Sequence, residues 1–97
     1  MPVIGPIGGL SVVKYKIVLS RQARRYYSGV DTDTVKRLND VFEVLESNPR
    51  PMMSKPLKGE LQGFHRVRVG HLRIIYQLDE SSQEVRIVKI GPRGDIY

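Results

Sequence analysis

Residues 64–78 read FHRVRVGHLRIIYQL and contain two β-rich runs separated by Gly70-His71. Glycine tolerates the positive φ that a two-residue hairpin loop requires, so this stretch predicts two antiparallel strands joined by a tight turn. The loop length also determines which residues face each other across the hairpin. The expected pairs are Val69 with Leu72, Arg68 with Arg73, Val67 with Ile74 and Arg66 with Ile75.

The predicted register separates two kinds of side chain. Because side chains alternate along a strand, Arg66, Arg68 and Arg73 share one open face. The other face is apolar and is expected to form the core; it consists of Val67, Val69, Leu72, Ile74 and Tyr76. Two arginines directly opposite each other repel at a cost of about 0.2 to 1 kcal/mol, which favours a bound anion such as phosphate between them. The alternative is a solvated strand face whose long arginine stems cover apolar neighbours.

The segments on either side of the hairpin predict the rest of the fold. Residues 14–19 alternate with the period of a strand, and Ser20 is a suitable N-cap for a brief basic helix. From Thr32 to Ser47 apolar residues recur at spacings of three and four, which predicts a second helix. Residues 49–63 hold three prolines and two glycines and are expected to form a surface connection. With strands over 64–69, 72–78 and 85–90, the order is an N-terminal strand, two helices and a three-stranded antiparallel meander. This is an α+β domain with the helices on one face of the sheet.

Composition limits the function further. The 97 residues suit one domain, expected over 14–97, after a flexible N-terminal tail at 1–13. The tail is too short and too interrupted by proline and glycine to span a membrane. With no cysteine and two histidines we expect no metal site and no cofactor, and a cytoplasmic protein. The net charge of +6 favours a polyanionic partner, either nucleic acid or an acidic protein segment; the alternative is that the charge serves solubility alone.

The C-terminal run IGPRGDIY adds two candidates. Gly91-Pro92 is expected to end the last strand and turn Arg93 away from it. Tyr97 ends the sequence, and an aromatic ring beside a cationic face can stack on an unpaired base. Terminal residues are also often frayed, in which case Tyr97 has no role.

The run KPLKGELQGFHRVRVGHLRIIYQLD at 55–79, followed by VRIVKIGPRGDIY at 85–97, resembles the RelE and ParE toxin superfamily, and most of all its RelE-type mRNA interferases. The resemblance covers residues 14–97. It implies a RelE-like fold and a toxin that cuts mRNA in the A site of the 70S ribosome and is inhibited by a cognate antitoxin protein. The implied reaction is a metal-independent transesterification by the ribose 2′-OH.

The resemblance also implies roles for individual residues. Arg66 and Arg68 take the places of two basic catalytic residues, and Arg73 that of an arginine gripping the phosphate. Arg93 falls beside the leaving group, and Tyr97 matches an aromatic that stacks on the substrate base. Further substrate-binding candidates are Lys55, Lys58 and His71.

One departure concerns the proton acceptor. The best-known member of the superfamily has lysines where Arg66 and Arg68 stand, and arginine stays protonated at neutral pH, so no general base is assigned. His65 alternates onto the core face and is interpreted as a packing residue, while His71 lies at the hairpin tip. Two other readings stay open: a ParE-like inhibitor of DNA gyrase, and an inactive module that binds RNA or the antitoxin.

Overall fold

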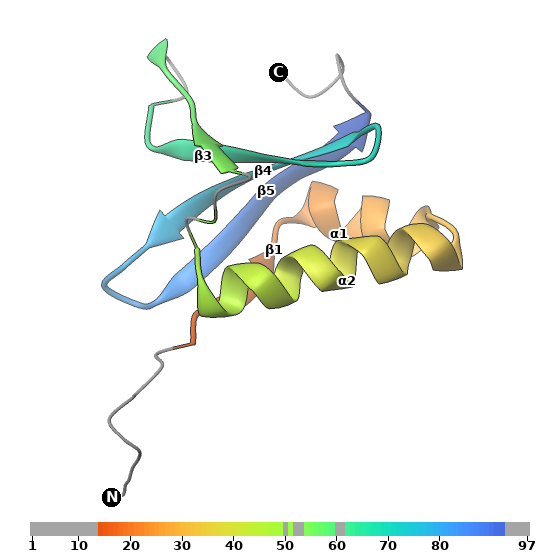
Figure 1. The fold of residues 1–97 in the computed structure, drawn as a ribbon, viewed down its shortest axis with the longest axis horizontal. Coiled ribbons are helices and arrows are strands. Elements are labelled where there is room, and N and C mark those ends of the chain that lie inside the picture. The colour runs from red at the N-terminus through yellow and green to blue at the C-terminus, as the bar shows by residue number, and fades with distance from the viewer. Residues whose placement is uncertain (1–13, 50, 52–53, 60–61, 93–97) are drawn as a thin grey trace, which may run out of the picture.

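The computed structural model describes residues 14–49, 51, 54–59 and 62–92, and the predicted tail at 1–13 lies outside them. The elements follow the order β1 (Lys16–Leu19), α1 (Arg21–Gly29), α2 (Thr32–Ser47), β2 (Ser54–Pro56), β3 (Phe64–Val69), β4 (Leu72–Asp79) and β5 (Glu84–Pro92). The strands form one sheet in the order β1-β5-β4-β3-β2 (Figure 1). β1 runs parallel to β5, and the other neighbours are antiparallel.

The expected α+β class, the two helices and the antiparallel β3, β4 and β5 are confirmed, whereas the connection over 49–63 is corrected. This segment contributes β2, a three-residue strand that pairs with β3. Its signal is weak because it is short and ends at Pro56, which has no N–H to donate and is tolerated at a sheet edge. The sheet is therefore mixed and five-stranded.

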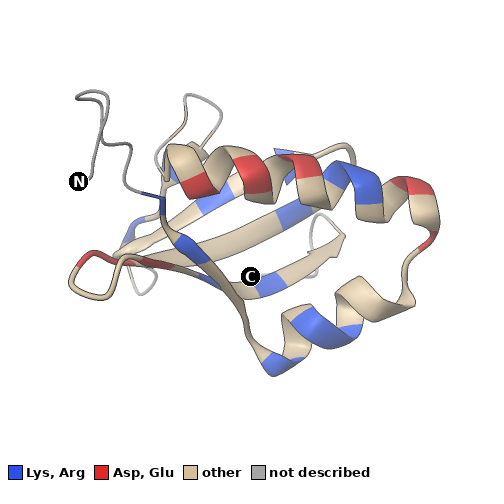
Figure 2. Ribbon diagram, turned by 90° about the horizontal axis from the view of Figure 1, so that it is seen from below, with Lys and Arg blue, Asp and Glu red and all other residues tan. Residues whose placement is uncertain are grey.

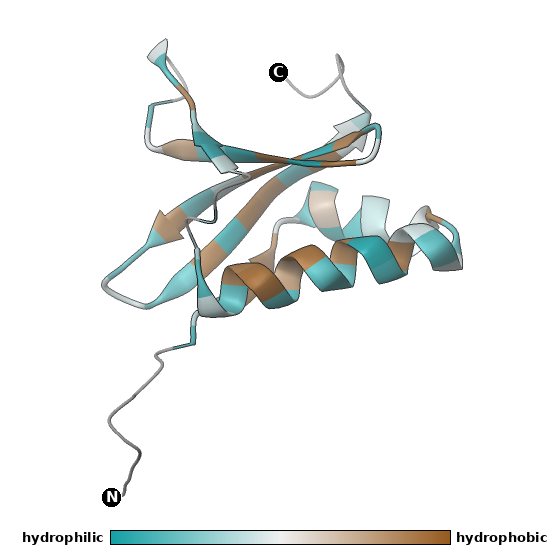
Figure 3. Cartoon of the chain, in the orientation of Figure 1, coloured by the Kyte–Doolittle hydropathy of each residue, from teal (hydrophilic) through white to brown (hydrophobic). Residues whose placement is uncertain are grey.

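Both helices pack on one face of the sheet, as predicted (Figure 1). The Ser20 hydroxyl accepts a hydrogen bond from the Ala23 amide at 3.1 Å and caps α1. In α2 the buried residues are Leu38, Val41 and Leu45, spaced by three and four. They meet the apolar side of the strands, where Val67, Ile74, Tyr76, Val85, Ile87 and Ile90 are fully buried. Figure 3 shows the alternation of hydrophobic and hydrophilic segments along these elements.

The β4–β5 pairing contains one irregularity. Ile75 lies opposite Lys89, but the next residue, Tyr76, lies opposite Ile87, so Val88 is an extra residue in β5. Such a bulge reverses which side of the sheet the following side chains occupy.

No helix among the described segments is both long and apolar enough to cross a membrane.

Candidate functional site

The β3–β4 hairpin has the predicted register. Arg68 lies opposite Arg73 and Arg66 lies opposite Ile75. Gly70 adopts φ +61°, the left-handed conformation that the turn requires of it. The three arginines therefore lie on the sheet face opposite the helices, while Val67, Ile74 and Tyr76 are buried on the helical face.

The burial of Arg73 corrects one expectation. Although Arg73 belongs to the face away from the helices, it is only 8% exposed, whereas Arg68 is exposed. A guanidinium that has lost most of its water interacts more strongly with an anion than a solvated one does. Its truncation is also expected to affect packing, because a long stem is removed from a buried position.

Two further lysines join this face. Lys55 in β2 pairs directly with Arg66, and Lys89 in β5 pairs with Ile75, which is the partner of Arg66 on the other side. We call Lys55, Arg66, Arg68, Arg73 and Lys89 the cationic face. Lys89 was missed by sequence reasoning because strict alternation from the buried Val85 would direct it into the core. The extra residue Val88 changes that direction.

Arg86 also lies on this side of β5. Its guanidinium donates to the Asp79 carboxylate at 2.8 Å and to that of Glu84 at 3.2 Å. The pKa of Asp79 lies below its usual value, first because the Ser81 hydroxyl donates to it, then because of the Ser82 amide and Arg86. These acidic neighbours satisfy Arg86, so it is not included in the cationic face.

The two histidines occupy the predicted positions. His65 stacks on the ring of Tyr76 at a centroid distance of 5.2 Å, and the buried Tyr76 donates its hydroxyl to the carbonyl of Pro49 at 2.8 Å. His65 is thus a packing residue on the helical side of the sheet. His71 is exposed in the turn between β3 and β4.

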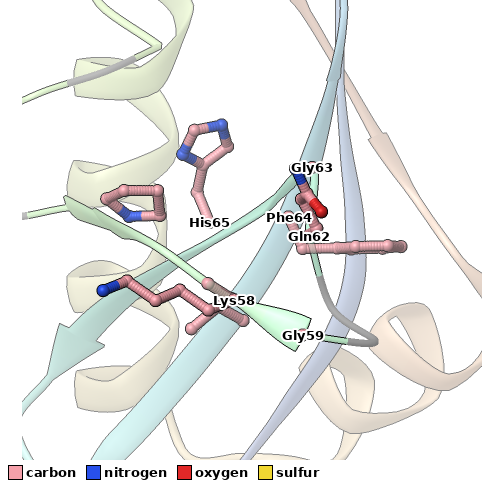
Figure 4. Close-up of a pocket in the computed structure, with 8 residues that line it drawn as sticks. Lys58, Gly59, Gln62, Gly63, Phe64 and His65 are labelled. Carbon is pink, nitrogen blue, oxygen red and sulfur yellow. The ribbon is translucent and has the colours of Figure 1, made fainter.

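Lys58 lines a pocket of about 490 Å³ at the β2–β3 connection. The described residues that line it are Pro56, Leu57, Lys58, Gly59, Gln62, Gly63, Phe64 and His65. Figure 4 shows the rings of Phe64 and His65 pointing in different directions, as expected for neighbours in a strand. The arginines of the cationic face are not among the residues lining this pocket, so the predicted substrate-binding set is divided.

Arg93 and Tyr97 lie outside the described residues, so their predicted roles stay predictions. Across residues 14–49, 51, 54–59 and 62–92 there is no group of three or more histidine, aspartate or glutamate side chains placed to hold a metal ion. Figure 2, seen from the helical side, shows acidic segments along α2 and only basic ones along α1. The charge on the helical side is therefore mixed. On the opposite side of the sheet, β5 also carries Arg86, whose carboxylate partners are Asp79 and Glu84.

Comparisons with known proteins identify the family. Residues 17–97 match the family described as the ParE toxin of type II toxin-antitoxin systems, parDE. The chain is 37% identical over 57 residues to Toxin RelE of Mycobacterium tuberculosis, covering 59% of this chain and 58% of that protein. It is 38% identical over 45 residues to Toxin RelG of the same organism, covering 46% of this chain and 52% of that protein. The chain thus matches little more than half the length of these curated relatives.

Solved structures agree on the fold. The toxin-antitoxin complex RelBE2 of Mycobacterium tuberculosis gives a TM-score of 0.74 at 27% identity, covering 86% of this chain and 95% of that one. The archaeal RelE–RelB complex of Pyrococcus horikoshii gives a TM-score of 0.73 at 24% identity, covering 84% of this chain and 98% of that one. The isolated RelE toxin of E. coli gives a TM-score of 0.70 at 15% identity, covering 80% of this chain and 83% of that one. A likeness at such low identity shows the fold alone. The α+β arrangement is therefore RelE-like, and the chain belongs to the ParE toxin family of type II toxin-antitoxin systems, within the RelE/ParE superfamily.

Proposed function

We propose that this protein is the toxin of a toxin-antitoxin pair and that it cleaves mRNA as an endoribonuclease. The observation that carries the proposal is the Arg68–Arg73 pair. The hairpin register places these two cations directly opposite each other, with Arg66 two residues along β3. Opposed arginines destabilise a sheet by about 0.2 to 1 kcal/mol, and a bound phosphate converts this repulsion into attraction.

The reaction is a transesterification within the RNA strand. The ribose 2′-oxygen attacks the adjacent phosphorus, the bond from phosphorus to the 5′-oxygen breaks, and a cyclic phosphate and a free 5′-hydroxyl result. Charge accumulates on the phosphate oxygens in the transition state, and guanidinium groups fixed on neighbouring strands stabilise that charge. Arg73, being largely buried, is assigned the main phosphate contact.

The proposed reaction also requires two proton transfers. The 2′-hydroxyl must lose a proton and the leaving 5′-oxygen must gain one. His65 is not placed for this, because it packs against Tyr76 on the helical side of the sheet. We propose that catalysis is mainly electrostatic and that the ribosomal A site contributes to proton transfer. Arg93 is assigned to the leaving oxygen and Tyr97 to stacking on the base.

A protein inhibitor is part of the proposal. One of the solved structures similar to this chain, RelBE2 of Mycobacterium tuberculosis, is a toxin-antitoxin complex. The cationic face offers such a partner an electrostatic docking surface, because an acidic flexible segment would be attracted to it. An antitoxin that covers Arg66, Arg68 and Arg73 would prevent RNA from reaching them.

A second candidate function is inhibition of DNA gyrase. It is favoured by the family description, which names ParE. A protein that binds gyrase without cutting RNA does not require cations gathered around one phosphate, and the cationic face therefore supports the ribonuclease. An inactive module that binds RNA or the antitoxin would keep the same face and show neither activity.

The test compares RNA cleavage with gyrase inhibition in the same preparations. Induced expression should create new mRNA 5′ ends inside translated codons, and purified protein should cleave transcripts in a translating extract while leaving gyrase supercoiling unchanged. Arg73→Gln should lower cleavage by about 10²- to 10³-fold, as for loss of one transition-state donor. Lys36→Gln, on the outer side of α2, removes the same charge and should retain activity. Inhibited supercoiling with intact mRNA would establish the gyrase function instead.

A further inference from the structure

The bulge in β5 determines which residues of this strand reach the cationic face. Ile87 and Ile90 are both fully buried although they are three residues apart, a spacing that strict alternation does not allow. The extra residue Val88 accounts for it, because pairing passes from Tyr76–Ile87 to Ile75–Lys89. If Val88 paired regularly with Ile75, Lys89 would pair with Ile74 and its side chain would point into the apolar core. Because Val88 bulges out of the pairing, Lys89 shares a face with Arg66 and Arg73.

Side chains at the start of α1 hold this bulged segment. Pairing of β1 with β5 ends at Leu19–Ile87, and Ser20 then donates its hydroxyl to the carbonyl of Val88 at 2.6 Å. Gln22 donates its amide to the carbonyl of Ile90 at 2.9 Å and accepts the Ile90 N–H at 3.0 Å. The Gln22 side-chain amide therefore forms the two hydrogen bonds with Ile90 that the backbone of a neighbouring strand would otherwise form. Bulges that redirect a side chain are concentrated next to active sites.

The surroundings of Lys89 distinguish it from Arg86, which lies three residues earlier. Arg86 is held by two carboxylates, whereas Lys89 is exposed and forms no salt bridge with the residues that the structure describes. Lys89 is also the diagonal neighbour of Arg73, since Arg73 pairs with Gly91. Diagonal neighbours in antiparallel strands are about 7 to 8 Å apart. This backbone separation allows the two side chains to contact successive phosphates of one strand.

We propose that Lys89 binds the phosphate of single-stranded RNA next to the one held by Arg73, and that Gln22 is a positioning residue that keeps Lys89 on the cationic face. The inference rests on the proposed function in so far as RNA is the substrate. It extends the site across three strands, because Arg66 and Arg68 come from β3, Arg73 from β4 and Lys89 from β5. It also explains why α1 contributes polar side chains to the edge of β5 at this point.

The test measures binding separately from cleavage. The probe is a short single-stranded RNA with every 2′-oxygen methylated, which cannot undergo the reaction, and its affinity is measured over a series of salt concentrations. Lys89→Met should weaken binding by roughly tenfold, as expected for loss of one charged hydrogen bond. The slope of log affinity against log salt should become shallower by about 0.7, the value for one phosphate contact on a single strand. Lys89→Arg should restore most of the slope.

Two controls separate this role from net charge and from folding. Lys36→Met removes one exposed lysine from α2 and should leave the salt slope nearly unchanged. Gln22→Leu should reduce affinity in the wild-type background and have little further effect when Lys89 is already Met, because both substitutions remove the same contact. A purely structural effect of Gln22 would instead add to that of Lys89.

The outcomes distinguish the inference from the nuclease assignment. A slope change specific to Lys89→Met supports the inference even if the wild-type protein cleaves nothing, in which case only the nuclease function is lost. Equal slopes for Lys89→Met and Lys36→Met overturn the inference, and cleavage by the wild type would still support the nuclease. Failure of the wild type to bind the RNA probe overturns the role of Lys89 as well.

Discussion

Ser20 stabilises two parts of the molecule through one hydroxyl group, so its replacement by alanine should cost more than the loss of an ordinary cap. The oxygen accepts the Ala23 amide at 3.1 Å and donates to the Val88 carbonyl at 2.6 Å. Loss of a serine N-cap costs about 1 kcal/mol, and loss of a part-buried hydrogen bond about 1 kcal/mol more. The sum is about 2 kcal/mol, which corresponds to a fall in the unfolding midpoint of about 8 to 16 °C for a domain of this size.

The assay is thermal and urea unfolding followed by circular dichroism, with two companion variants. Ser28→Ala makes the same chemical change in the last turn of α1, where the exposed hydroxyl donates to the Arg24 carbonyl at 2.9 Å, and should change stability by less than about 0.5 kcal/mol. Ser20→Thr keeps a hydroxyl and should retain most of the stability. A loss for Ser20→Ala no larger than that for Ser28→Ala would refute the reasoning, because neither the cap nor the bond to β5 would then contribute.

Three further expectations concern the sheet and its turns. Tyr76→Phe should lower the free energy of unfolding by about 1 to 2 kcal/mol in urea titrations, because it leaves the carbonyl of Pro49 without its 2.8 Å hydrogen bond. Gly70→Ala should cost about 1 to 3 kcal/mol in the same assay, since alanine is strained at φ +61°, and an unchanged midpoint would contradict this backbone conformation. The Ser81 hydroxyl lowers the pKa of Asp79 in the folded protein. The ionised Asp79 therefore stabilises the fold at pH values above the pKa of the unfolded chain, and this stabilisation is lost as the pH falls through the pKa of the folded protein. Asp79→Asn should therefore flatten the dependence of stability on pH below about 4, whereas parallel curves would argue against the bond.

Much of the hairpin and the helices could be predicted from the sequence because the signals are local. The apolar spacing over Thr32–Ser47 and the glycine of the turn at Gly70 act within a few residues, and the structure has the same helix bounds and the same turn. The hairpin register follows from the loop length alone, and with it the opposition of Arg68 and Arg73. Local signals were therefore enough to place three members of the candidate site on one face of the hairpin.

The remaining features depend on segments that are far apart in the sequence. The pairing of β1 with β5, the short edge strand β2 and the burial of Arg73 arise only when the strands assemble into a sheet. Lys89 is the clearest case, because the segment that carries it is held by hydrogen bonds between Ile90 and Gln22, which are 68 positions apart in the sequence. A bulge is defined by the pairing of two strands and produces no periodic pattern in the sequence of either strand. The sequence by itself determined the turn, the helices and the arginine pair, and the tertiary structure decided which further cations join them.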